Sequence, residues 1–364
     1  MSQDRSQLLS RPVRHLDIED FDVRALIDGY RETAFQGRNL AEAADIYSQM
    51  LADRDCAVVL TLAGSLVSAG LKQILVRLIE HDMVDVVVST GANVVDQDFF
   101  EGLGFRHYIA PGTPEAPVVA DEELQRLAID RIYDTYIDEN DLRTCDDVTR
   151  RIFDSLEPAA YSSRELCVEL GRYLDVHHPE NESLVLSAYR KGVPIFVPAF
   201  SDCSAGFGIV AHQAKAAAMG TAAVAFDSGK DFLELTRIKL AVPDTGLLMV
   251  GGGVPKNFAQ DAVVAGEILV EEGLVDAPAA GVPMHKYAVQ LTVADSRDGG
   301  LSGSTLREAC SWGKVATTRE RMVFGEATLT LPMVAGDAYH RGHWRGRKER
   351  RFNDMLTHTA SVGA

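Results

Sequence analysis

The stretch EACSWGKVATT (308–318) places one lysine, Lys314, beside a tryptophan and a glycine in largely apolar surroundings. A primary amine in such a setting can bind phosphate, act as a catalytic nucleophile, or lie in the core with its charged end reaching water. A Walker A loop is excluded, because Glu308 stands at its first glycine position and Val315 follows the lysine. The nucleophile and the structural lysine both remain open. Partial desolvation beside Trp312 would favour the neutral, reactive amine.

Glycine-rich turns follow three apolar stretches: LAGSLVSAG (62–70), STGAN (89–93) and GGGVPKN (251–257). At the carboxyl end of a parallel strand, glycine lets the backbone approach a ligand, and the next helix directs free N–H groups at phosphate. Each glycine could instead serve only a tight turn. No GxGxxG motif is present, so the ordinary dinucleotide fingerprint is absent. Three such turns in one chain nevertheless indicate a nucleotide site.

The elements that must position these residues alternate between apolar runs and amphipathic segments. We expect strands over 56–64, 84–92, 193–200, 221–229, 245–253, 287–295 and 322–332. Helical periodicity covers 68–83, 121–137 and 257–273. Continuous Val/Ile/Leu runs are typical of strands buried on both faces. The pattern predicts an α/β fold, with a mostly parallel sheet and helices on both faces.

The sequence predicts one large domain over 26–340, because it contains no clear linker, internal repeat or low-complexity tract. Residues 1–25 are interpreted as an N-terminal arm and residues 341–364 as a basic C-terminal tail. The run HRGHWRGRKERRF (340–352) could bind nucleic acid or rest as a solvated extension on an acidic body. The strongly negative remainder of the chain favours the second interpretation.

Composition limits the functional classes. The 364 residues are 46% hydrophobic and carry a net charge of −17, which disfavours nucleic acid as a partner. The five cysteines are scattered without a CxxC pair, as expected of reduced thiols in a cytoplasmic protein. The N-terminus lacks the apolar region of a signal peptide, and no apolar stretch is long enough to span a membrane. His177-His178 has no accompanying ligand spacing, so we expect no metal site.

Four motifs, in this order, resemble the deoxyhypusine synthase family, which includes homospermidine synthases and bacterial deoxyhypusine synthase-like proteins. They are HDMVDVVVSTGAN (81–93), VPIFVPAFSD (193–202), LLMVGGGVPKN (247–257) and ACSWGKV (309–315). The resemblance extends from about residue 56 to about residue 335.

The resemblance implies a Rossmann-like fold that binds NAD, and a homotetramer with sites at subunit interfaces. In such enzymes NAD accepts a hydride from the carbon next to a polyamine nitrogen, and a lysine then takes up the aminobutyl group as an imine. An acceptor amine displaces that group, and the hydride returns. The acceptor is a protein lysine in deoxyhypusine synthase and putrescine in homospermidine synthase. Lys314 matches the nucleophile.

The resemblance also assigns ligand-binding positions. Those for NAD are Gly64, Ser65, Leu66, Val67, Ser68, Thr90, Gly91, Ala92, Asp202, Gly252, Ala294, Asp298, Glu326 and Ala327. Asp202 and Asp298 could instead be loop caps or turn residues. Those for the substrate are Asp96, Asn257, Gly299, Glu308 and Trp312.

The substrate positions depart from the family pattern. Asn257 stands where the family has a histidine base, and an amide cannot take up a proton. Phe207 and Leu301 replace acidic contacts, and Val95 replaces the first of two glutamates, leaving Asp96. A trication such as spermidine would be poorly neutralised, since a buried unpaired ammonium costs several kcal/mol. We therefore expect a smaller or less charged amine, or a guanidino compound.

Three functions remain open. The first is an NAD-dependent aminoalkyl transferase acting on a small amine, similar to homospermidine synthase. The others are deoxyhypusine synthesis on a protein lysine, and a catalytically altered NAD-binding homologue with a regulatory role.

Overall fold

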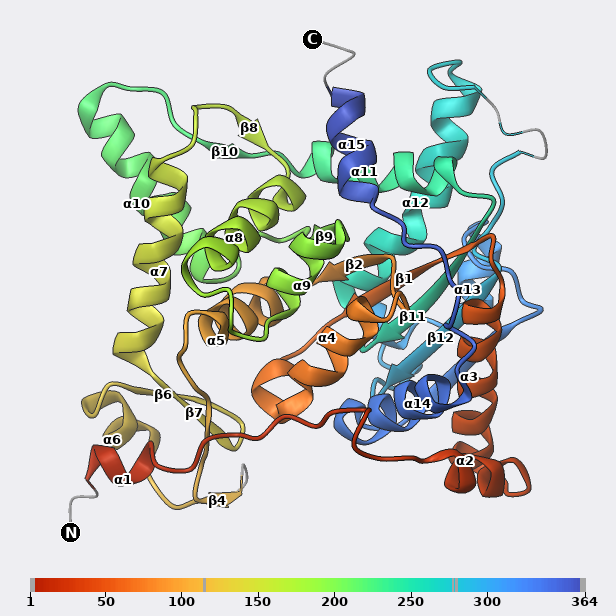
Figure 1. Cartoon of the computed structure of the whole chain (residues 1–364), viewed down its shortest axis with the longest axis horizontal. Helices are drawn as coiled ribbons and strands as arrows, with labels where there is room; N and C mark the ends of the chain where they lie inside the picture. The colour runs from red at the N-terminus through yellow and green to blue at the C-terminus, as the bar shows by residue number, and fades with distance from the viewer. Residues whose placement is uncertain (1–3, 114–115, 277, 279–280, 361–364) are drawn as a thin grey trace.

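Six parallel strands form the central sheet of the computed structural model, which describes residues 4–113, 116–276, 278 and 281–360 (Figure 1). In spatial order they are β13 (Glu320–Phe324), β12 (Tyr287–Thr292), β11 (Asp244–Val250), β1 (Cys56–Leu62), β2 (Val86–Ser89) and β9 (Ile195–Phe196). Along the chain, β2 and β9 are added on one side of β1, and β11, β12 and β13 are later added on its other side. The point where the strand order reverses therefore lies between these two strands, which is where open α/β sheets bind ligands.

Strand β1 is buried on both faces, because its alternating side chains enter different cores. Val58 and Leu60 pack with a core that includes α3 (Phe35–Ala52), α4 (Lys72–Glu80) and α14 (Ala327–Arg341). Ala57 and Val59 pack with a second core. Its helices are α11 (Ser228–Ala241), α12 (Gly253–Glu271), α13 (Leu306–Ser311) and α15 (Phe352–Ala360). The predicted α/β sheet with helices on both faces is confirmed.

The other longer helices lie beyond the β9 edge or in the N-terminal segment. They are α2 (Arg24–Arg31), α7 (Glu139–Asp154), α8 (Ser163–His177), α9 (Leu184–Lys191) and α10 (Ser204–Met219). The π-helical turns η1 (Val67–Leu71) and η2 (Ala92–Phe99) follow β1 and β2, and η2 continues into α5 (Phe100–Gly102). Within the described ranges, no helix combines the length and apolar character needed to cross a bilayer.

A small antiparallel sheet corrects the helix predicted over 121–137. Helix α6 (Asp121–Arg126) is short, and the chain then forms β6 (Ile129–Ile132) and β7 (Thr135–Asp138). Strand β7 lies in the middle of the small sheet and pairs with both β6 and β3 (Tyr108–Ile109). Ala128 and Tyr133 adopt φ values of 52° and 51°, which end the helix and turn the hairpin. The N-terminal α1 (Arg5–Leu8) packs its Leu8 into the satellite core of this unit.

Two predicted strands also need correction. Of residues 221–229, only β10 (Ala225–Phe226) is extended, and it pairs with β8 (Ala160–Tyr161) outside the central sheet. Of residues 322–332, the second half belongs to α14, because the Glu326 carboxylate caps that helix by accepting the Thr328 N–H at 2.9 Å. Strand β4 (Gly112–Thr113) pairs antiparallel with β5 (Ala116–Pro117).

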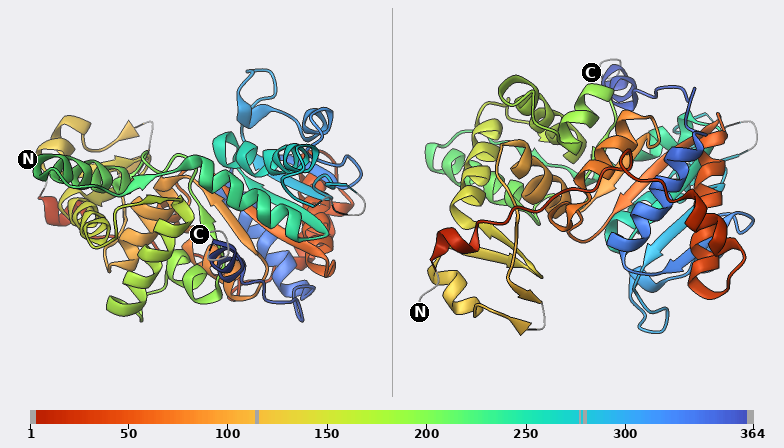
Figure 2. Two further views of the ribbon diagram at one scale, coloured as in Figure 1. Left: turned by 90° about the horizontal axis from the view of Figure 1, so that it is seen from above. Right: turned by 60° about the horizontal axis from the view of Figure 1, so that its bottom comes forward.

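The described parts of the N-terminal segment and of the basic run contact the body of the protein. Between α1 and α2, the N-terminal segment crosses the outside of the molecule (Figure 2, right). Its His15 bonds through Nε2 to the buried Glu101 at 2.7 Å. In the basic run, Arg347 is buried: it pairs with Asp85 at 2.6 Å and donates to the backbone carbonyl of Asp82 at 2.7 Å. Residues 1–3 and 361–364 of the predicted arm and tail lie outside the described residues.

Arg347 gives a stability prediction. Substituting Arg347→Ala leaves the buried Asp85 carboxylate short of its closest cation, so the free energy of unfolding falls by about 3–5 kcal/mol. Urea unfolding of the full chain measures the loss. The exposed Lys348→Ala in the same run is the control and changes stability by less than about 0.5 kcal/mol. A loss below 1 kcal/mol in Arg347→Ala would contradict the burial of this pair.

Candidate active site

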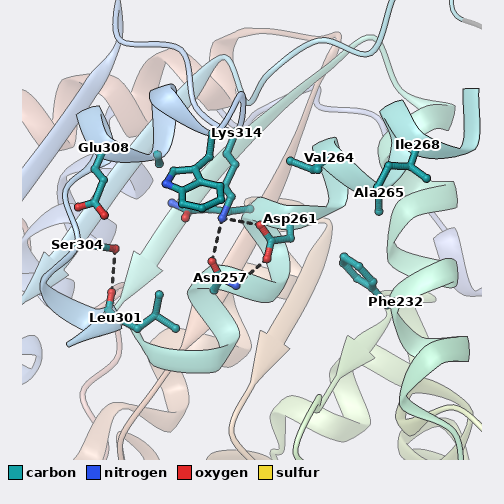
Figure 3. Close-up of a pocket in the computed structure, with 13 residues that line it drawn as sticks. Phe232, Asn257, Asp261, Val264, Ala265, Ile268, Leu301, Ser304, Glu308 and Lys314 are labelled. Carbon is teal, nitrogen blue, oxygen red and sulfur yellow. Dashed lines mark hydrogen bonds and ion pairs between the residues drawn. The ribbon is translucent and has the colours of Figure 1, made fainter. Parts of the chain in front are cut away.

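Lys314 follows α13 and directs its amine toward α12 (Figure 3). Its Nζ lies 2.5 Å from Asp261 Oδ1 and donates to Asn257 Oδ1 at 3.1 Å. Asn257 Nδ2 in turn donates to Asp261 Oδ2 at 2.6 Å. The three side chains form a closed ring of polar contacts, so the amine has a fixed position.

The lysine environment differs from the expected apolar one. Only 12% of the Lys314 side chain is exposed, but its nearest partner is a carboxylate. The Trp312 ring centroid lies 5.4 Å from Nζ, within cation–π range, yet 66% of Trp312 is exposed. The indole therefore does not seal the amine from water in the single chain, and the packing of Lys314 against α12 accounts for its burial.

A cavity of about 590 Å³ opens beside this amine. One wall is apolar and comes from α11 and α12: Phe232, Val264, Ala265 and Ile268. The opposite side carries the polar ring together with Glu308, Ser304 and Leu301 (Figure 3). Four predicted site residues thus meet around one cavity: Asn257, Glu308, Trp312 and Lys314.

Sequence reasoning missed Asp261. A signal was available, because Asn257 and Asp261 are four residues apart on a predicted helix and therefore lie on the same face. The carboxylate could only be assigned to Lys314 once the loop after α13 was seen to bring the lysine against that face.

A second cavity, of about 700 Å³, lies at the carboxyl ends of the strands. It spans the topological switch point, since the turns after β1 and β11 both line it. Seven of the predicted NAD positions line this cavity: Gly64, Ser65, Leu66, Gly252, Ala294, Glu326 and Ala327. Gly64 has φ 77°, and a Cβ placed on it would meet no heavy atom within 4 Å, so the backbone at this turn is open to a ligand.

The other predicted NAD positions do not line this cavity. Val67 and Ser68 are buried, and Ser68 Oγ donates to the Ser65 carbonyl at 3.0 Å. Thr90 lies behind the Gly64 turn, where its hydroxyl bonds the Gly64 carbonyl at 3.3 Å. Ala92 begins η2, beyond that turn.

The last three predicted NAD positions also lie outside this cavity: Gly91, Asp298 and Asp202. Gly91 is required by packing, because a Cβ there would approach Cys203 Sγ to 2.5 Å. Asp298 accepts from the Gly300 N–H at 2.6 Å, as a turn residue does, and the neighbouring Gly299 has φ 73°. Asp202 is exposed just before α10.

The two cavities lie on either side of the turn η3 (Leu301–Gly303) and Ser304. Ser302 lines the larger cavity, whereas Leu301 and Ser304 line the one beside Lys314. Gly252 lets this turn approach, because a Cβ there would lie 2.5 Å from Ser302 Cα.

Lys256 lies on α12, is fully buried, and anchors the turn at 301–304 through hydrogen bonds. Its Nζ donates to the Ser304 carbonyl at 2.6 Å and to Gln290 Oε1 at 3.0 Å. Burial lowers the pKa of Lys256 to about 8; the Glu308 charge opposes this shift, and the Lys314 charge adds to it.

Asp96 lies outside both cavities, where η2 meets the start of α10. Its Oδ1 accepts the Ser204 N–H at 2.6 Å. Burial raises the pKa of Asp96 to about 6; the Ser204 hydrogen bonds oppose the rise, and the nearby Asp146 and Asp202 add to it. A buried carboxylate with a raised pKa is a candidate for a functional role.

Comparisons with known proteins agree with the resemblance found in the sequence. A family model described as deoxyhypusine synthase matches residues 25–338. The chain is 55% identical to a deoxyhypusine synthase-like protein of Chlorobaculum parvum, over 98% of this chain and 97% of that one. It is 50% identical to a deoxyhypusine synthase-like protein of Coxiella burnetii, over 97% and 96%. A protein of Methanosarcina mazei named "Probable deoxyhypusine synthase 2" is 39% identical, over 89% and 88%.

A solved structure has a similar fold. The crystal structure of a protein assigned as a deoxyhypusine synthase from Entamoeba histolytica superposes with a TM-score of 0.57, over 93% of this chain and 99% of that one. Sequence identity in this pair is 15%, so the likeness concerns the fold alone.

Asp96 gives a pH-dependent prediction. Because its pKa is raised in the folded state, the cost of ionising it appears as pH rises from about 4 to 6 and is complete above that range. Asp96→Asn should therefore stabilise the protein at pH 8 by about 1–3 kcal/mol and have little effect near pH 4. Urea unfolding at both pH values measures this difference. The exposed Asp20→Asn controls for the general loss of a negative charge, and equal effects of the two substitutions would refute the assignment.

Proposed function

Because the chain belongs to the deoxyhypusine synthase family, we propose that it is an NAD-dependent transferase that carries an aminoalkyl group on Lys314. The substrate is a small amine, and the homospermidine synthase reaction is the nearest named activity. The observation that carries the proposal is the Lys314 amine, fixed at the wall of a cavity and separated by one turn from the glycine-rich strand ends.

The larger cavity supports NAD as the cofactor. Its volume is within the range of small-molecule sites, and its open turn at Gly64 lies at the switch point. Glu326 offers a carboxylate for a ribose hydroxyl, although one of its oxygens also caps α14. Bound NAD supplies hydride acceptance from the carbon next to the substrate nitrogen, and later returns the hydride.

The residues around Lys314 supply the transfer chemistry. The neutral amine attacks the carbon of the substrate imine, the original amine departs, and Lys314 retains the alkyl group as its own imine. A second amine then attacks the same carbon and frees Lys314. Trp312 and Glu308 hold the remaining ammonium group by cation–π and ionic attraction.

The cavity favours a substrate with few charges. Asp261 is already occupied by Lys314 and Asn257, which leaves Glu308 as the other carboxylate among the described lining residues. The wall formed by Phe232, Val264 and Ile268 is suited to an alkyl chain. These features fit a diamine or a guanidino amine better than a trication.

The proposed site is completed by the assembly of several copies of the chain. Asp96 and Asp202, which the family pattern assigns to ligands, lie outside the cavity beside Lys314. A cytoplasmic homotetramer with sites shared between subunits, as in the family, would bring such residues to the ligand sites of a neighbouring copy.

Turnover tests the proposed function. Purified protein is incubated with NAD and each of putrescine, spermidine and agmatine, singly and in pairs, and products are identified by mass spectrometry. Lys314→Ala should lower turnover at least about a thousandfold, while Lys348→Ala leaves it unchanged. Full turnover in Lys314→Ala would refute the proposal. Transfer of label from spermidine to a protein lysine would instead identify deoxyhypusine synthesis.

A further inference from the structure

The contacts of Lys314 have a consequence for proton transfer. Among the described residues, both polar partners of its Nζ come from one face of α12: Asp261 at 2.5 Å and Asn257 at 3.1 Å. Asn257 also anchors the second oxygen of Asp261 at 2.6 Å. The carboxylate is therefore held with one oxygen on the amide and the other on the amine.

Transfer of an alkyl group between amines requires a proton to move twice. The attacking amine must lose a proton, and the departing nitrogen must gain one before its bond to carbon breaks. Asn257 can do neither, because an amide neither accepts nor releases a proton in this pH range. Glu308, the other carboxylate among the described lining residues, is exposed and forms neither a hydrogen bond nor an ion pair with Nζ.

We infer that Asp261 is the proton acceptor and donor of the transfer step, an inference that rests on the proposed function. Asp261 first takes a proton from the Lys314 ammonium, which frees the lone pair of Nζ. That lone pair forms the bond to the iminium carbon, and the electrons of the carbon–nitrogen double bond move onto the substrate nitrogen.

The same carboxyl group then completes the exchange. Asp261 passes its proton to the substrate nitrogen and then accepts a second proton from Nζ, which after the attack carries two protons and a positive charge. The lone pair freed on Nζ forms the double bond to carbon as the bond between carbon and the substrate nitrogen breaks. The departing group leaves as a neutral amine, one proton remains on the Lys314 iminium and one on Asp261, so protons, charge and electrons balance without a further reactant.

Asn257 acts as a positioning residue in this scheme. Its carbonyl oxygen accepts one N–H of Lys314, and its Nδ2 holds Asp261 Oδ2, so Oδ1 stays directed at the amine. This arrangement places a proton-transfer group one helical turn beyond the position where the family has histidine.

Other charges bear on the amine. Glu308 lines the same cavity, and Lys256 lies beneath the adjoining turn and is coupled electrostatically to Lys314. Unlike Asp261, neither of these two side chains forms a hydrogen bond or an ion pair with Nζ. Replacing Asp261 should therefore affect Lys314 more directly than a change in either of them.

Two rates at pH 7.5, measured on the full chain without NAD, separate proton transfer from placement. The first is acetylation of Lys314 by acetic anhydride, which requires only a neutral amine. The second is discharge by butylamine of an imine preformed between Lys314 and butanal, with the remaining imine trapped by cyanoborohydride. Peptide mass spectrometry quantifies Lys314 in both.

Asp261→Asn should move the two rates in opposite directions. Loss of the anion favours the neutral amine, so acetylation becomes several-fold faster. Loss of the proton carrier slows discharge by about a hundredfold or more. The control Glu271→Gln, which removes one exposed carboxylate from the last turn of α12, changes neither rate.

Asp261→Glu keeps a carboxylate and should retain discharge within about tenfold of wild type. This variant also controls for a folding defect caused by any change of side chain at position 261. Unchanged discharge in Asp261→Asn, or two rates that fall together, would overturn the inference. So would failure of wild-type Lys314 to form the butanal imine. Because the assay supplies the carbonyl compound directly, loss of turnover with NAD and natural amines would refute the proposed function without affecting this result.

Discussion

The burial of β1 on both faces is the constraint on which the rest of the molecule depends. Strand Cys56–Leu62 has no solvent-facing side, so helices must cover both faces and the strands beside it must be joined by crossovers. Because the strands are parallel, their carboxyl ends all lie at the same edge of the sheet. The turns after β1, β11, β12 and β13 therefore meet around one cavity, although they are far apart in sequence.

The same arrangement brings a second cavity close to the first. Helix α12 begins at the switch point, where Gly252 admits the turn at 301–304, and continues past Lys256 to the Asn257–Asp261 face. One helix thus contacts both the strand-end cavity and the lysine cavity. Only the turn at 301–304 separates the two cavities, which is the arrangement that the proposed transfer between a dinucleotide and Lys314 requires.

The sequence predicted those features that depend on local pattern. The apolar runs at 56–64, 245–253 and 287–295 indicated the strands β1, β11 and β12. The motif around Lys314 indicated a lysine that does line a cavity, and its role as a nucleophile stays a prediction. The helix expected over 121–137 was wrong because periodicity does not reveal the left-handed residues Ala128 and Tyr133, which divide the segment. The partner of Lys314 was not predicted either, since the contact with Asp261 joins two elements separated by more than fifty residues.

A covalent intermediate on Lys314 is the central claim, and its mass is the most direct measurement. The protein is mixed with NAD and one amine at a time, treated with cyanoborohydride, and weighed intact. The account predicts a mass increase that maps to Lys314, is absent from Lys314→Ala, and corresponds to the aminoalkyl fragment of the donor. Bound NAD without any mass increase across the amine panel would contradict it and favour an altered, non-catalytic member of the family.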